Sequence, residues 1–175
     1  LQQFEGGVVG TVMTNMGLEK AFENDGIPFI RTPVGDRYVI ESMLERGWQI
    51  GGEQSGHIIC LEHATTGDGI ISALQVISAV CFYEKPLSAV RKGMFKYPQT
   101  LVNIRLEKDV NIMADAEVQH AIADAEKLLA DRGRILVRKS GTEPLLRIMV
   151  EANEEQLVHQ VANQLAEIVK EKCAV

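Results

Sequence analysis

The chain has 175 residues, of which 46% are hydrophobic and 24% are charged, and this composition is typical of folded globular proteins. A formal net charge of -6 and only 5% aromatic residues disfavour a nucleic-acid surface, but they leave room for a local pocket that binds a small anion. No apolar run reaches the roughly 18 residues of a membrane span, and Cys60, Cys81 and Cys173 lack metal or disulfide spacing, so we expect a cytoplasmic protein with reduced thiols and no membrane partner.

The first half of the chain alternates between predicted strands and helices. Helices are expected from Met16 to Asn24, from Asp36 to a stop at Gly47, and from about Asp68. Strands are expected in segments 6–14, 28–31, 48–52 and 57–62. This alternation predicts an α/β layered unit with a largely parallel sheet.

The second half has a different pattern. Pro86 and Pro98 punctuate a basic, weakly periodic stretch, and we place the domain boundary there, between residues 87 and 88. Beyond it, the strands are expected at 101–107, 134–138 and 145–152. Helices are expected at 115–133, closed by Gly133, and at 153–172. The order βαββα predicts a small two-layer α+β domain.

The segment "RKSGTEPLLR" (138–147) concentrates anion-binding groups at a turn between two predicted strands. Arg138 offers a planar fork for two phosphate oxygens, and Arg147 follows on the next strand. Ser140 and Thr142 add hydroxyl donors, while Gly141 lets a ligand approach the backbone N–H groups. The alternative is a solvated turn, but the concentration of donors favours a phosphate cradle. It is not a Walker A loop, because the G-x-x-x-x-G-K-[ST] order is missing.

The glycine-rich segment "GGEQSGH" (51–57) combines a carboxylate with a hydroxyl. Glu53 and Ser55 lie two residues apart on a segment expected to be extended, so both should point to one side, where neighbouring sugar hydroxyl or amino groups need such partners. A nucleophile elbow is excluded, because positions 53 and 57 hold Glu53 and His57 instead of glycine. His57 could be a structural histidine or an acid/base group.

Together with "TTGDGI" (65–70), these segments resemble the α-D-phosphohexomutase superfamily, and within it the bacterial phosphoglucosamine mutases. The resemblance runs from "GGVVGTVMTNMGLE" (6–19) to the last helix. It implies an incomplete three-layer α/β domain, domain 3 of the family, at residues 1–87. It also implies the smaller domain 4, of order βαββα, at residues 88–175.

The resemblance also implies roles for individual residues. Glu53, Ser55 and His57 match the sugar-binding loop. The phosphate-binding loop is matched by Arg138, Ser140, Gly141, Thr142 and Arg147. Asp36 and Arg37, in "VGDRY", match another substrate-facing loop. Asp36 stands where glucose- and mannose-type relatives often carry histidine, which favours an amino sugar; the alternative is a helix N-cap. Asp68 is expected to be a cap rather than a metal ligand.

Two family segments are absent from the sequence: the T-A-S-H-N-P-like phosphoserine segment and the D-G-D-x-D-R magnesium loop. The resemblance therefore implies the C-terminal, substrate-binding part of an enzyme whose full-length form uses Mg²⁺. That enzyme would interconvert glucosamine 6-phosphate and glucosamine 1-phosphate through a phosphoserine and a bisphosphate. We expect this chain alone to be inactive and to bind hexosamine phosphate, with a homodimer as a candidate assembly.

Two rival interpretations remain open at this point. One is a phosphomannomutase or phosphoglucomutase of the same superfamily, which substrate comparison would separate. The other is a free-standing sugar-phosphate-binding module, because small βαββα units also serve as sensors.

Overall fold

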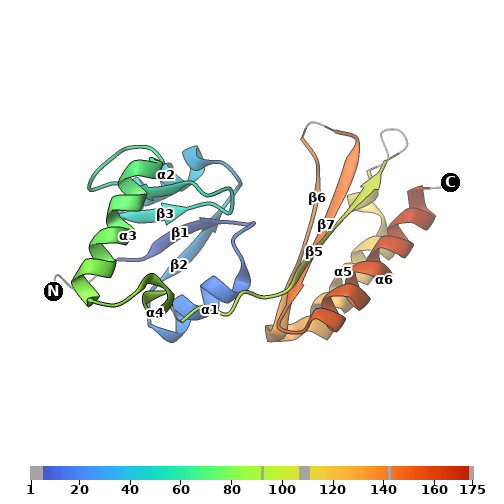
Figure 1. The fold of residues 1–175 in the computed structure, drawn as a ribbon. Helices are drawn as coiled ribbons and strands as arrows, with labels where there is room; N and C mark the ends of the chain where they lie inside the picture. Colours follow the sequence, from blue (N-terminus) through green and yellow to red (C-terminus); the bar gives the residue numbers. More distant parts are fainter. Residues whose placement is uncertain (1–5, 92, 107–110, 142, 174–175) are drawn as a thin grey trace. The chain divides into compact units, whose positions relative to one another are not determined.

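A computed structural model describes residues 6–91, 93–106, 111–141 and 143–173. The chain forms two compact units, residues 1–96 and 97–175, and the division falls between Pro86 and Pro98. Each unit has its own sheet (Figure 1).

The first unit contains a four-stranded sheet of order β2-β1-β3-β4. Strands β1, β2 and β3 run parallel and β4 is an antiparallel edge, so the expected, largely parallel α/β sheet is confirmed. The elements of this unit are β1 (Val8–Thr11), α1 (Met16–Asn24), β2 (Phe29–Thr32), α2 (Asp36–Arg46), β3 (Ile50–Gly52), β4 (Ile58–Cys60), α3 (Gly69–Tyr83) and α4 (Leu87–Val90).

Helices α1 and α2 cover opposite faces of this sheet. Val9 of β1 packs with Val39 and Met43 of α2 in a buried cluster. On the other face, Phe22 of α1 stacks on Phe29 of β2 with 5.7 Å between the ring centroids. Because successive strand residues point to opposite faces, β1 is buried along its whole length.

Helix α3 begins as the sequence predicts. The side chain of Asp68 accepts hydrogen bonds from the backbone N–H groups of Ile70 and Ile71, at 2.8 and 3.0 Å, so the expected cap is confirmed. The helix is apolar on all sides, yet none of its 15 residues is buried. Across the described residues, every helix is too short or too polar to cross a membrane.

The second unit is a three-stranded antiparallel sheet of order β5-β7-β6 with both long helices on one face (Figure 1). The elements are β5 (Gln99–Arg105), the 3-10 turn η1 (Ile112–Ala114), α5 (Ala116–Leu129), the 3-10 turn η2 (Ala130–Arg132), β6 (Gly133–Lys139), β7 (Leu145–Ala152) and α6 (Glu155–Cys173). The predicted βαββα order is confirmed.

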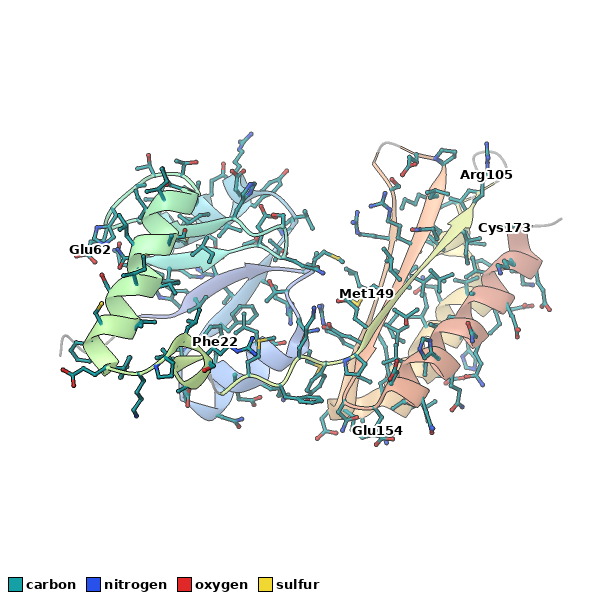
Figure 2. All side chains as sticks on the ribbon, viewed as in Figure 1. Phe22, Glu62, Arg105, Met149, Glu154 and Cys173 are labelled. Atoms are coloured by element: carbon teal, nitrogen blue, oxygen red, sulfur yellow. The ribbon has the colours of Figure 1, made fainter. Side chains whose placement is uncertain are left out.

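The core of the second unit lies between the sheet and the helices. Alternate residues of β7, Leu146, Ile148 and Val150, are fully buried against Val161 and Leu165 of α6. By alternation, Arg147 and Met149 belong to the other face, and Figure 2 shows Met149 on the side away from α5 and α6.

One predicted boundary in this unit is wrong. Helix α5 ends at Leu129, and Gly133 is the first residue of β6 rather than the stop of the helix. A Cβ at Gly133 would lie 2.5 Å from the carbonyl oxygen of Glu151 and 2.7 Å from the Cβ of Ala152. The glycine is therefore required by the close approach of β7.

Candidate functional site

The carboxyl ends of β1, β2 and β3 meet at one edge of the first sheet, because these strands are parallel. The loops that leave this edge are residues 12–15, 33–35 and 53–57. Strand β1 lies between β2 and β3, so the chain winds in opposite directions from it. In open α/β sheets, this switch point is where ligands bind.

Residues 53–57 form a tight turn between β3 and β4, not the extended segment that the sequence suggested. The N–H of Glu53 donates to the carbonyl oxygen of His57 at 2.8 Å. The N–H of Gly56 donates to the carbonyl oxygen of Glu53 at 3.1 Å. Glu53 and Ser55 consequently do not share one side. The Glu53 side chain is only 7% exposed, whereas Ser55 is exposed in the turn.

The Glu53 carboxylate joins this turn to the loop before α2. Its Oε2 accepts a hydrogen bond from the N–H of Gly35 at 3.1 Å. Its Oε1 lies 3.6 Å from Nδ1 of His57, whose side chain is 55% exposed. The structure thus brings Glu53, His57 and the "VGDRY" loop together.

Helix α2 begins at Asp36, as expected, but its N-cap is Gly35, with a φ of 134° and no side-chain cap. The alternative that Asp36 is the N-cap is therefore wrong. Asp36 Oδ1 instead accepts from the N–H of Arg37 at 2.8 Å. Arg37 Nε lies 2.9 Å from Glu41 Oε1, and this hydrogen bond raises the pKa of the Arg37 guanidinium.

A pocket of about 380 Å³ opens beside Glu53, between α1 and the strands β1 and β3. Its wall is mostly apolar, with Thr14, Asn15 and Gln54 supplying polar atoms. Asn15 Oδ1 also caps α1 by accepting from the N–H of Gly17 at 3.0 Å. The sequence did not predict this pocket, because only the fold places α1 beside the turn.

In the second unit, Arg138 and Arg147 lie directly opposite each other on β6 and β7. Both are on the sheet face opposite the helices, since Ile148 and Val137 pack on the helix side. Asn103 of β5 pairs with Arg147 from the other side and completes a polar row across the sheet. Asn103 was not predicted, because its place in this row depends on strand register.

The turn between β6 and β7 is a hairpin connection, as predicted. The N–H of Ser140 donates to the carbonyl oxygen of Leu145 at 2.8 Å, which closes the hairpin. Gly141 is exposed, and no atom lies within 4 Å of where its Cβ would be. Thr142, also predicted as a ligand, lies outside the described residues.

The two arginines differ in their partners. Arg147 Nη2 lies 3.0 Å from Glu143 Oε2, and its buried Nε has no hydrogen-bond partner in the described part of the chain. Arg138 is half-buried and makes no ion pair with the residues that the structure describes. Two adjacent cations with unused donors are suited to an anion such as phosphate.

The chain matches two domains of one protein family. Residues 1–97 match the phosphoglucomutase/phosphomannomutase family at its alpha/beta/alpha domain III. Residues 101–168 match the C-terminal domain of the same family.

Among curated relatives, the chain is 56% identical over 168 residues to a phosphoglucosamine mutase of Aeromonas hydrophila, covering 96% of this chain and 38% of the relative. It is 52% identical over 172 residues to a phosphoglucosamine mutase of Azotobacter vinelandii, covering 98% of this chain and 39% of the relative. The chain thus spans less than two-fifths of the length of these relatives.

Solved structures show the same fold. The N-acetylphosphoglucosamine mutase of Aspergillus fumigatus superimposes with a TM-score of 0.81 at 18% identity, covering 98% of this chain and 39% of that one. An N-acetylglucosamine-phosphate mutase in its substrate complex gives 0.76 at 22% identity, covering 95% and 39%.

Proposed function

The chain belongs to the phosphoglucomutase/phosphomannomutase family, and on this premise we propose that it is the substrate-binding part of a cytoplasmic bacterial phosphoglucosamine mutase. The whole enzyme interconverts glucosamine 6-phosphate and glucosamine 1-phosphate and supplies precursor for cell-wall amino sugars. In it, a phosphoserine gives its phosphoryl group to the free end of the sugar, and the bisphosphate then returns phosphate from the other end.

In this proposal, the hairpin of residues 138–147 binds the phosphate that is not reacting. Arg138 and Arg147 neutralise its charge, and Ser140, Gly141 and Thr142 donate hydrogen bonds to it. Binding and charge neutralisation are much of what phosphoryl transfer requires from a protein. The observation that carries the proposal is the opposed pair of arginines on the sheet face away from the helices, because like charges placed directly opposite each other repel and a bound anion offsets that repulsion.

The loops at the carboxyl edge of the first sheet bind the sugar. Glu53 and Ser55 contact ring hydroxyls, with His57 beside them, and Asp36 and Arg37 form the loop that faces the amino group. The similarity to phosphoglucosamine mutases supports an amino sugar. Comparing the affinities for glucosamine 6-phosphate and glucose 6-phosphate tests this choice against a phosphoglucomutase or phosphomannomutase.

The family resemblance also implies magnesium for the full-length enzyme. Among the described residues, no three His, Cys, Asp or Glu side chains are grouped as a metal site requires. In the proposed function, the residues of this chain bind and position the substrate.

The test is the affinity of the chain for glucosamine 6-phosphate, measured by calorimetry. Arg138→Ala removes charge-assisted hydrogen bonds worth about 1.5–3 kcal/mol and should weaken binding by about 10- to 100-fold. Arg132→Ala is the matched control, because Arg132 is exposed, lies just before β6 and donates to the carbonyl oxygen of Leu128. Unchanged affinity in Arg138→Ala would refute the phosphate site.

A further inference from the structure

We propose that Glu53 is a positioning residue that holds the loop before α2 in place, so that Asp36 can distinguish an amino group from a hydroxyl group. This rests on the proposed function and adds a second role to Glu53 beyond contact with the sugar ring. The role concerns the selectivity for the amino sugar rather than the overall affinity.

The environment of Glu53 supports this role. Its side chain is 7% exposed, and a buried carboxylate needs hydrogen-bond donors to offset its desolvation. One such donor is the N–H of Gly35, which lies 3.1 Å from Glu53 Oε2. Gly35 is the N-cap residue of α2. The N-cap residue Gly35 has no side chain to cap α2, so Glu53 adds a second negative charge to that of Asp36 at the helix N-terminus.

The hydrogen bond joins two segments that are each held by backbone hydrogen bonds. The turn that carries Glu53 is closed by two backbone hydrogen bonds and by the pairing of β3 with β4. Gly35 is tied to α2 through its carbonyl oxygen, which accepts from the N–H groups of Tyr38 and Val39 at 3.0 and 3.4 Å. Its φ of 134° is a conformation that glycine adopts but other residues rarely do. The carboxylate therefore links the turn to the first turn of α2, where Asp36 lies.

The hydrogen bond itself can be observed in the 175-residue chain by NMR. In Glu53→Ala, the Gly35 amide should shift upfield and exchange faster with solvent, because its acceptor is lost. Glu53→Gln keeps an acceptor oxygen of the same reach and should largely restore the amide. Glu45→Gln is the control, since Glu45 is an exposed carboxylate on α2. An unchanged Gly35 amide in Glu53→Ala would overturn the inference.

The consequence for selectivity is tested by a double-mutant cycle on the ratio of affinities for glucosamine 6-phosphate and glucose 6-phosphate. Asp36→Asn should lower this ratio by about 2- to 5-fold, the usual range for an exposed charge pair. Glu53→Ala should lower it equally, and the double variant should lower it no further, because both act through Asp36. Glu53→Gln should keep the ratio near that of the unmodified chain.

The outcomes separate this inference from the proposed function. If Glu53→Ala only removed a contact to ring hydroxyls, it would weaken the binding of both sugar phosphates equally. The ratio of their affinities would then be unchanged, and the positioning role would be overturned. Additive effects of Asp36→Asn and Glu53→Ala would likewise overturn the positioning role while leaving the sugar-phosphate site intact. If Arg138→Ala also leaves binding unaffected, the proposed function itself fails.

Discussion

Arg138 and Arg147 bring two guanidinium groups to directly opposite positions on β6 and β7. Directly opposed side chains in an antiparallel pair have Cβ atoms about 4.5–5.5 Å apart, and like charges in such a pair are destabilising. Glu143 offsets the charge of Arg147 only in part, because this carboxylate is 55% exposed. In the proposed function, a bound phosphate offsets this repulsion.

Gly141 gives a prediction at the same hairpin. Since no atom lies within 4 Å of its would-be Cβ, Gly141→Ala should leave the melting temperature unchanged. A methyl group there should nevertheless hold phosphate away from the backbone N–H groups. We expect glucosamine 6-phosphate affinity to fall by about fivefold, the equivalent of one net hydrogen bond of about 1 kcal/mol. Calorimetry together with thermal unfolding measures both quantities.

Gly69→Ala is the control for Gly141→Ala. Gly69 also has open space around its would-be Cβ, but it lies at the start of α3 in the first unit and is not part of the hairpin of residues 138–147. The Gly69→Ala variant should bind glucosamine 6-phosphate with the same affinity as the unmodified chain. Equal affinities in the two variants would show that the ligand does not approach the backbone at Gly141.

At the scale of elements, short-range signals predicted the helices and strands well. Asp68 and Asp115 stand just before apolar periodic segments, and both side chains accept hydrogen bonds from the N–H groups of the first turn. The prediction that α2 stops at Gly47 was also correct. Gly47 has a left-handed φ of 68°, a conformation in which glycine commonly ends a helix. These features depend on residues within four positions of one another.

Features that depend on tertiary contact were missed or wrong. The hydrogen bond from Gly35 to Glu53 joins residues 18 positions apart, and no periodicity signals it. Gly133 was predicted to end a helix because glycine is common just after the last helical residue. In the structure, a glycine is needed at this position because Ala152 of β7 approaches closely. The candidate residues could therefore be named from sequence, but not the contacts that hold them.

The helix caps give a prediction that separates the two units. Asp115→Ala should cost about 1 kcal/mol and lower the melting temperature of the second unit by about 4–8 °C. Far-ultraviolet circular dichroism should report this shift. Fluorescence of Trp48, the single tryptophan, should not, because Trp48 packs on the core cluster of the first unit.

Asp68→Ala is the reciprocal variant, since Asp68 caps α3 in the first unit. It should lower the transition seen by Trp48 fluorescence and spare that of the second unit. A shift of both transitions by either variant would mean that the units unfold together, contrary to the expectation from their separate cores.

At the scale of the whole molecule, apolar surface is distributed unevenly. The second unit buries a large cluster between its sheet and helices, whereas the described core of the first unit centres on Val9, Val39, Met43 and Ile59. Helix α3 leaves Ile70, Leu74 and Ile77 exposed by 75%, 54% and 56%. A helix that is apolar on all sides is usually buried in a larger assembly.

This exposed surface gives the last prediction. Leu74 and Ile77 lie three positions apart on one side of α3, so their side chains are neighbours and form one apolar strip. Because contiguous exposed apolar area drives association, the purified chain should self-associate, with a sedimentation coefficient that rises with concentration. Leu74→Glu combined with Ile77→Glu should give a monomer at the same concentrations, whereas Leu128→Glu, at a 44% exposed apolar residue of the second unit, should not. If the double variant sediments like the unmodified chain, association does not run through α3, and the edge strands β2 and β4 become the surface to test.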